Sequence, residues 1–256
     1  MKTRWLGPAL LSLTIVMGAA QLRAAQGEPV RVLASNGVKA AVDELSPAAQ
    51  SSIGHTLALQ YGTTVLNKQK IEAGENFDAT ILTSEAIDAL IKEGKLAARS
   101  RTDMGRVGIG VGIRAGAKKP DIGTPDGIKQ TLLNAKAVTY ASDGASRVHI
   151  EKMFEALGIT DKMKPKLVLV QGSDASLNAV KGGKAEIILT LISEIMPDKG
   201  VELVGPLPDK FQSYVSFAAG VNAGAKNPDA ANALIKFLSA PKAASTFKAK
   251  GIQTGK

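Results

Sequence analysis

Short apolar runs alternate with longer amphipathic stretches through most of this chain, and the alternation predicts its secondary structure. Brief apolar runs bounded by polar turns are typical of strands, whereas apolar residues three and four positions apart are typical of helices. In the first part of the chain, strands are predicted at 30–34, 56–61 and 77–82, each followed by a helix, at about 37–52, 65–71 and 84–94. This order favours a parallel sheet with helices on both faces.

A second set of the same kind follows, and it is bounded by two long predicted strands at 106–113 and 213–221. Its elements are predicted as helix 125–133, strand 137–140, helix 146–157, strand 167–170, helix 175–182 and strand 186–190. Two amphipathic helices, at about 228–239 and 241–249, end the chain. The glycines at 108, 110 and 112 alternate within a strand and open no helix, which argues against a dinucleotide-binding site.

The two sets predict two α/β lobes. The first lobe is expected to comprise residues 26–106 and 215–256, and the second residues 107–214, so that the chain crosses between them twice. Ligands of open α/β sheets bind outside the carboxyl ends of the strands. The cleft between the lobes is therefore the place where we expect the functional residues.

The N-terminal segment, residues 1–25, has the pattern of a secretory signal peptide. Lys2 and Arg4 precede an apolar stretch at 6–20, and small residues follow it. A membrane anchor, the alternative, would need about 20 apolar residues, and this stretch is shorter and contains Pro8. The chain also has no cysteine that could carry a lipid. We expect a periplasmic protein whose mature chain has no membrane anchor.

The charge of the chain is basic, with 32 Lys and Arg against 23 Asp and Glu. A nucleic-acid-binding protein would cluster its basic residues and interleave aromatic ones. Here the lysines are scattered along the predicted helices, and aromatic residues make up only 4% of the chain. The composition argues against nucleic acid as a partner and favours small acidic ligands. We expect a monomer.

Three predicted strands lead directly into small polar turns that open helices. The turn residues are Ser35, Asn36 and Gly37 after the first strand, Thr63 and Thr64 after the second, and Ala145, Ser146 and Arg147 after the strand at 137–140. A helix N-terminus carries unpaired N–H groups and the positive end of the helix dipole, and small turn residues let an anion approach them. Their convergence in one cleft predicts a binding site for a small anion.

Three further segments, at 70–74, 154–158 and 237–247, complete a pattern that resembles a known family. Together with the opening strand and the order of the elements, they resemble the periplasmic molybdate-binding proteins, within the type 2 periplasmic solute-binding fold. The resemblance implies two lobes, each a mainly parallel sheet flanked by helices, with two crossover strands at the hinge. It also implies a solute receptor that delivers its anion to an ABC permease.

In that family hydroxyl and backbone N–H groups hold the oxyanion, without a full positive charge in contact. Carried over by position, the resemblance implies ligand contacts from Ser35, Asn36, Thr63, Thr64, Ala145 and Ser146. Gly37 stands where a serine would be expected, and Leu191, preceded by Thr190, stands where a tyrosine would be expected. These departures argue against molybdate as the ligand and leave Thr190 as the hydroxyl group on that side.

Arg147 is an addition to this pattern. A cation in the first turn of a helix opposes the helix dipole at a cost of roughly 0.3–1 kcal/mol, unless an anion lies nearby. Guanidinium can clamp a carboxylate with two parallel hydrogen bonds, so we expect a polycarboxylate in preference to molybdate or tungstate. Lys39 repeats the pattern in the first predicted helix. The alternatives are that both side chains reach water, or that Arg147 pairs with Asp143 or Glu151.

An enzyme on the same scaffold is the alternative function, because aconitate isomerase is similar to the molybdate-binding proteins. Interconversion of cis- and trans-aconitate moves a proton between two carbon atoms and requires no cofactor or metal. It does require a general acid or base whose pKa lies near the working pH. His149, two residues beyond Arg147, is the first candidate for this group and Lys39 the second.

Overall fold

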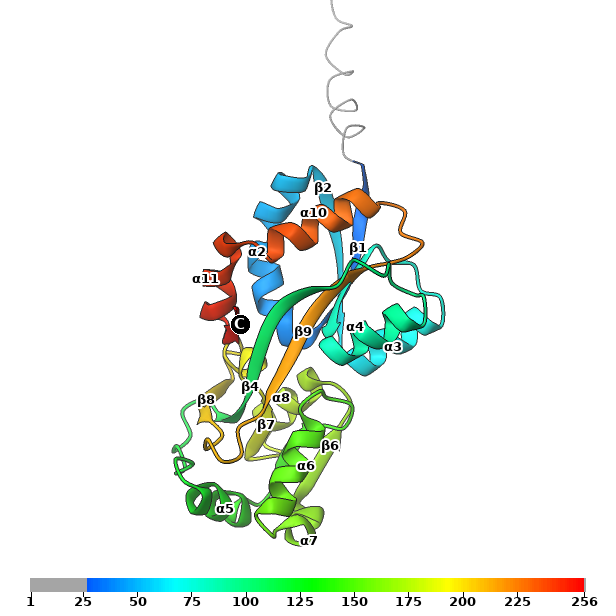
Figure 1. Ribbon diagram of the computed structural model, residues 1–256. Coiled ribbons are helices and arrows are strands. Elements are labelled where there is room, and N and C mark those ends of the chain that lie inside the picture. Colours follow the sequence, from blue (N-terminus) through cyan, green and yellow to red (C-terminus); the bar gives the residue numbers. More distant parts are fainter. Residues whose placement is uncertain (1–26, 256) are drawn as a thin grey trace, which may run out of the picture.

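The computed structural model describes residues 27–255, and the predicted signal peptide at 1–25 lies outside these residues. The described chain forms two α/β lobes connected by two long strands (Figure 1). Within this part of the chain, no helix has the length and apolar character needed to cross a membrane.

The first lobe is built on three parallel strands in the order β2-β1-β3. Helices α2 and α10 lie on one face of this sheet, and α3 and α4 on the other (Figure 1). Its elements are β1 (Gly27–Ser35), the 3-10 helix η1 (Asn36–Val38), α2 (Lys39–Ile53), β2 (His55–Gly62), α3 (Thr64–Glu72), β3 (Ala79–Thr83), α4 (Ser84–Lys92), α10 (Pro228–Leu238), α11 (Pro241–Ala249) and β10 (Ile252–Gln253).

The second lobe has a parallel core of its own, in the order β7-β5-β6. Its elements are α5 (Pro125–Asn134), β5 (Val138–Ala141), α6 (Arg147–Ala156), α7 (Thr160–Met163), the 3-10 helix η2 (Lys164–Lys166), β6 (Leu167–Val170), α8 (Ser173–Lys181), β7 (Ile187–Leu191), α9 (Ile192–Ile195) and β8 (Val201–Pro206). The short elements α7, α9 and β8 have no counterpart in the pattern predicted from the sequence.

Two antiparallel strands, β4 (Thr102–Arg114) and β9 (Tyr214–Val221), connect the lobes. The first half of β4 pairs with β9, which in turn pairs with β3. Its second half pairs with β7 and β8, so one sheet continues through both lobes. The register of β4 shifts on either side of the crossing, between Asp103 and Gly105 and between Val111 and Gly112. The predicted fold class, with two crossover strands, is confirmed.

The apolar core follows this shared strand. Val107 and Ile109 of β4 and Phe217 of β9 are fully buried in the largest cluster, which contains residues of both lobes. Smaller clusters lie under α4 and under α8. The two lobes are thus packed as one body around the connecting strands.

Local signals in the sequence explain where several helices begin and end. The hydroxyl group of Thr63 accepts a hydrogen bond from the amide of Leu66 at 3.2 Å and caps α3. Thr124 caps α5 in the same way, followed by a proline in the first turn. Gly54 ends α2 with a φ of 72°, in the left-handed region that favours glycine.

A buried carboxylate, Asp78, connects the start of β3 to the far end of the chain. It is 3% exposed and accepts hydrogen bonds from the amides of Arg31, Lys226 and Asn227 at 2.9–3.0 Å. The last two amides precede α10, so Asp78 fixes this C-terminal helix against the first strands. Buried carboxylates are tolerated where hydrogen bonds replace the lost water.

Candidate functional site

The carboxyl ends of strands from both lobes meet at a small enclosed space, which we call the cleft pocket. It has a volume of about 10 Å³, which is close to that of one water molecule. Its lining comprises Ser35, Thr63, Thr64, Ala141, Gly144, Ala145, Ser146, Ser173, Thr190, Leu191 and Glu194. Six of these residues were candidates from the sequence: Ser35, Thr63, Thr64, Ala145, Ser146 and Thr190.

The chemistry of the cleft pocket is dominated by hydroxyl groups and helix N-termini. The side chains of six hydroxyl residues in its wall are buried, namely Ser35, Thr63, Thr64, Ser146, Ser173 and Thr190. Helices α3 and α6 begin at Thr64 and Arg147, directly beside the pocket. The first-turn N–H groups of a helix have no acceptor within it. Some of these groups already have an acceptor, since the amide of Leu66 donates to the hydroxyl group of Thr63 and the amides of Arg147 and His149 donate to the carbonyls of Gly144 and Ser146. The neutral groups that line the pocket from both lobes are therefore mainly hydroxyl groups.

Three hydrogen bonds hold the two lobes together around this pocket. The hydroxyl group of Thr63 donates to Asp143 at 2.9 Å. The side-chain amide of Asn36 donates to the hydroxyl oxygen of Ser173 at 3.0 Å. The hydroxyl group of Ser193 donates to the carbonyl of Gly37. Each bond joins one residue of the first lobe to one of the second, so the structure shows the lobes in a closed arrangement.

Gly37 is held where the two lobes touch most closely. Its carbonyl accepts a hydrogen bond from the hydroxyl group of Ser193 at 2.7 Å. A Cβ atom added at Gly37 would lie 2.6 Å from Cζ of Phe217 and 2.8 Å from Cδ1 of Leu191. At these distances the side chains of Phe217 and Leu191 would have to shift to admit a Cβ atom, which explains physically why glycine fits this position in the first turn after β1.

Glu194 is a member of the cleft pocket that the sequence analysis missed. Its carboxylate accepts a hydrogen bond from the hydroxyl group of Thr190, four residues earlier. Burial raises the pKa of Glu194, although hydrogen bonds from Thr190 and Ser173 partly oppose this effect. The position of Glu194 just beyond a buried strand that ends in Thr190 and Leu191 is the sequence signal that could have identified it.

A second, more open space adjoins the cleft pocket, and we call it the side pocket. It has a volume of about 250 Å³ and shares Ser173 and Glu194 with the cleft pocket. Asn36 and Lys39, two candidates from the sequence, line the side pocket instead of the cleft pocket. The ammonium group of Lys39 is 2.7 Å from Asp43 and is partly exposed.

Arg147 and His149 lie outside both pockets. The exposed guanidinium group of Arg147 donates to Glu151 one turn later, at 2.8 Å, and to the carbonyl of Ser142, also at 2.8 Å. Pairing with Glu151 was the alternative left open by the sequence, and it is the arrangement in the structure. His149 is partly buried on α6 and does not reach the cleft pocket.

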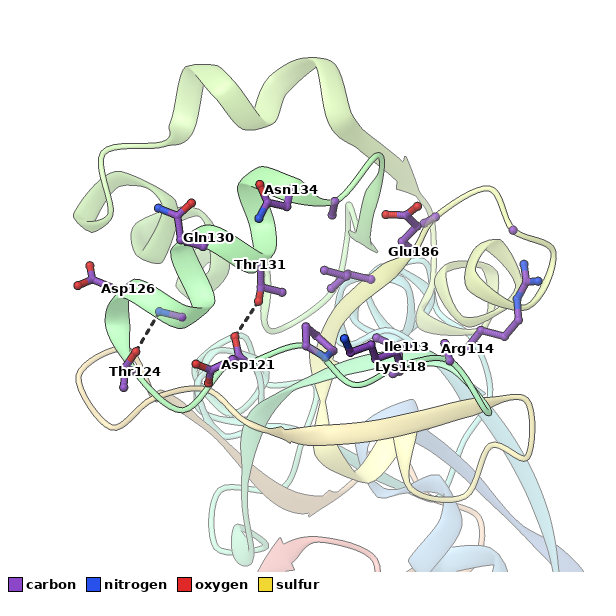
Figure 2. Close-up of a pocket in the computed structure, with 17 residues that line it drawn as sticks. Ile113, Arg114, Lys118, Asp121, Thr124, Asp126, Gln130, Thr131, Asn134 and Glu186 are labelled. Atoms are coloured by element: carbon purple, nitrogen blue, oxygen red, sulfur yellow. Dashed lines mark hydrogen bonds between the residues drawn. The ribbon is translucent and has the colours of Figure 1, made fainter.

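A much larger cavity lies elsewhere, in the second lobe beside α5 (Figure 2). It has a volume of about 920 Å³. Figure 2 shows Gln130 and Asn134 pointing away from Lys118 and Arg114 across a broad groove. Two hydrogen bonds lie along the groove: the hydroxyl group of Thr131 donates to the carbonyl of Asp121, and that of Thr124 accepts from the amide of Gly127. Its polar groups do not converge on one point, so size alone does not make this groove the functional site.

Comparison with known proteins gives a consistent picture of the chain. A family model described as bacterial extracellular solute-binding protein matches residues 30–253. Aconitate isomerase of Pseudomonas sp is 27% identical over 253 residues, which cover 96% of each chain. The molybdate-binding protein ModA of Azotobacter vinelandii is 25% identical over 258 residues, covering 95% of this chain and 97% of the relative.

The solved structures support the same fold. The periplasmic molybdate-binding protein of Azotobacter vinelandii superposes with a TM-score of 0.77 at 15% sequence identity. The superposition covers 89% of this chain and 100% of that structure. At this level of identity the likeness concerns the fold and leaves the choice of ligand to the residues of the site.

Proposed function

This chain belongs to the family of bacterial extracellular solute-binding proteins, and we propose that it binds a small, multiply charged anion in the cleft between its lobes. The observation that carries the proposal is the cleft pocket, where buried hydroxyl groups and two helix N-termini converge from both lobes. Such donors stabilise negative charge without a cation. A receptor of this kind would act in the periplasm and deliver its anion to an ABC permease.

We further propose that the ligand is a polycarboxylate in preference to molybdate or tungstate. The relative at 27% identity is by its name an aconitate isomerase, which acts on a carboxylate. In the cleft, neither Gly37 nor Leu191 offers a hydroxyl group. The set of hydroxyl donors thus differs from that expected of an oxyanion receptor of the molybdate type.

Arg147 remains the proposed cation for a carboxylate that extends beyond the cleft pocket. Its ion pair with Glu151 is exposed on a helix surface, where such pairs contribute only about 0.3–0.5 kcal/mol. A ligand carboxylate could therefore replace Glu151 at little cost. The guanidinium group would then hold the carboxylate with two parallel hydrogen bonds.

A thermal-shift experiment tests both parts of this proposal. The melting temperature is measured with molybdate, tungstate, citrate, tricarballylate and the two aconitates. A ligand at 100 times its dissociation constant adds about 2.7 kcal/mol of stability, which corresponds to roughly 5–10 °C for a chain of this size. A shift with the carboxylates supports the proposal, and a shift with molybdate or tungstate alone contradicts the preference for carboxylates.

Substitution of Arg147 by alanine tests its role. The variant should lose affinity for the carboxylates and keep its melting temperature without ligand. Arg101→Ala is the matched control, because Arg101 also forms exposed ion pairs, with Asp88 and Asp103, but lies in the first lobe. Equal affinity of the Arg147 variant and the control would remove Arg147 from the site.

A second candidate function is a cofactor-free isomerase that interconverts cis- and trans-aconitate. The observation in its favour is Glu194, a carboxyl group in the wall of the cleft pocket that can act as the base of this reaction when it is ionised. In this reaction a base removes a proton from the methylene carbon, the double bond shifts, and a proton is returned to the former alkene carbon. Glu194 lines the cleft pocket, whereas His149 and Lys39 do not.

Incubation of the protein with trans-aconitate, followed by chromatographic detection of the cis isomer, tests this candidate. Formation of cis-aconitate that is lost in Glu194→Gln supports an isomerase. Absence of conversion, with binding intact, leaves the receptor function alone.

A further inference from the structure

We infer that Glu194 takes up one proton when an anion enters the cleft and donates the resulting O–H group to that anion, so that binding is coupled to pH. The inference rests on the proposed binding of an anion in the cleft. It concerns the receptor function, in which the protein must accommodate a negative ligand beside this carboxyl group. In the isomerase alternative Glu194 must instead stay ionised, because it removes a proton from the bound substrate.

The geometry of Glu194 places it between the two pockets. It lines the enclosed cleft pocket on one side and the more open side pocket on the other. It can therefore contact a ligand in the first and exchange a proton with solvent through the second. Its hydrogen-bond partners are neutral groups, namely the hydroxyl groups of Thr190 and Ser173 and the backbone amide of Leu191. Among residues 27–255, Glu194 forms no ion pair.

The charged groups around Glu194 do not compensate for a second negative charge. The side pocket presents Asp174 of α8, Asp43 of α2 and Asp198 after α9, together with one cation, Lys39. Lys39 already pairs with Asp43. Asp198 is held by Lys181 at 2.8 Å, outside the pocket lining. Asp174 raises the pKa of Glu194 further, in the same direction as burial.

An ionised ligand adds further negative charge to the carboxylates that already surround Glu194. Two negative charges close together in a largely enclosed site favour the uptake of a proton by one of them. The carboxyl group of Glu194 is the group that can accept this proton, because burial already favours its neutral form. Once protonated, it becomes a hydrogen-bond donor and joins the hydroxyl groups of the wall as a further contact for the anion.

The coupling has a measurable size. If one proton is taken up for each anion bound, the affinity falls about tenfold for each unit of pH above the pKa of Glu194 in the free protein. Glu194→Gln replaces the carboxyl group with a neutral amide of the same shape that donates at every pH. Its affinity should be independent of pH and should match that of the unaltered protein at acidic pH.

Titration calorimetry with trans-aconitate, repeated with molybdate, tests the inference. Each titration is performed in two buffers with different heats of ionisation, which gives the number of protons taken up per anion. In the pH range where the affinity of the unaltered protein falls about tenfold for each unit of pH, the expected result is about one proton for the unaltered protein and none for Glu194→Gln. Glu85→Gln is the matched control, since Glu85 also lies in the first turn of a helix but is exposed and lines neither pocket.

The outcomes separate the inference from the function on which it rests. Binding without proton uptake, or uptake that persists in Glu194→Gln, overturns the inference and leaves anion binding intact. Absence of binding by either anion overturns the proposed function as well. Should Glu194→Gln fail to fold, Thr190→Val provides a second test. Loss of the Thr190 hydroxyl donor disfavours the ionised carboxylate, so the fall in affinity must move to higher pH.

Discussion

The hydrogen bond between Ser193 and Gly37 is the most direct point at which to test how the lobes are held together. The hydroxyl group of Ser193, in the second lobe, donates to the carbonyl of Gly37, in the first, at 2.7 Å, and both residues are buried. Ser193→Ala removes the donor and leaves that carbonyl without this partner while the lobes are closed. In an open cleft water can replace the donor, so the cost falls on closure.

The magnitude follows from the burial of this bond. A typical hydrogen bond contributes about 0.5–1.5 kcal/mol, and a buried acceptor left unpaired costs about 1–3 kcal/mol. A value of about 1.5 kcal/mol corresponds to roughly tenfold in an equilibrium constant. Because a ligand that is held by both lobes binds the closed form, a smaller closed fraction lowers its apparent affinity by the same factor. We expect Ser193→Ala to weaken anion binding about tenfold.

Two measurements check this expectation. Calorimetry gives the affinity for trans-aconitate, and small-angle X-ray scattering gives the radius of gyration with and without the anion. The ligand-free variant should be more extended than the unaltered protein, and the two should coincide when saturated. Ser239→Ala is the control, because the Ser239 hydroxyl is exposed and bonds only to a carbonyl at the end of its own helix. Unchanged affinity and unchanged scattering in Ser193→Ala would refute the argument.

Three further predictions concern stability. Burial raises the pKa of Glu194 above its ordinary value of 4.5, so the folded state keeps this proton to higher pH than the unfolded state. The stability that the neutral form contributes is therefore complete below pH 4.5 and is lost as the pH rises through the raised pKa. Glu194→Gln should therefore melt at a higher temperature than the unaltered protein near neutral pH, with the difference vanishing in acid, and an equal difference at all pH values would contradict this. Asp78→Ala leaves three amides without an acceptor and should cost about 3 kcal/mol, or roughly 6–12 °C in melting temperature, in a calorimetric scan. Gly37→Ala places a methyl group against Phe217 and Leu191 and should cost about 1–3 kcal/mol in chemical denaturation, whereas a neutral effect would show that this contact is loose.

The regular part of the fold could be predicted from the sequence because its signals are local. The alternation of buried strands and amphipathic helices identified the two lobes and both crossing strands, and β6 was predicted with its observed bounds, Leu167–Val170. Caps such as Thr63 and terminators such as Gly54 act within a few residues. Elements with only one helical turn, such as α9, lack any periodic pattern and could not be predicted in this way.

The site was predictable only where its residues belong to a strand-to-helix turn. Such turns predicted Ser35, Thr63 and Ser146, which line the cleft pocket in the structure. The direction of the Arg147 side chain was not predictable. The sequence is equally compatible with a guanidinium group that points at the cleft and with one that pairs with Glu151 one turn away. Glu194 was missed for a different reason, since α9, the one-turn helix on which it lies, has no periodic pattern that would draw attention to the residues just beyond β7.

The continuity of β4 through both lobes sets the kind of motion that the molecule can make. A pair of domains on a flexible tether can swing freely, but here the tether is itself a ribbon of paired strands that carries core residues on each side. Parting the lobes must bend that ribbon, and its two register irregularities are the places where added twist is accommodated most easily. Such a connection allows only a small elastic displacement of the lobes and couples the movement of one lobe directly to the other.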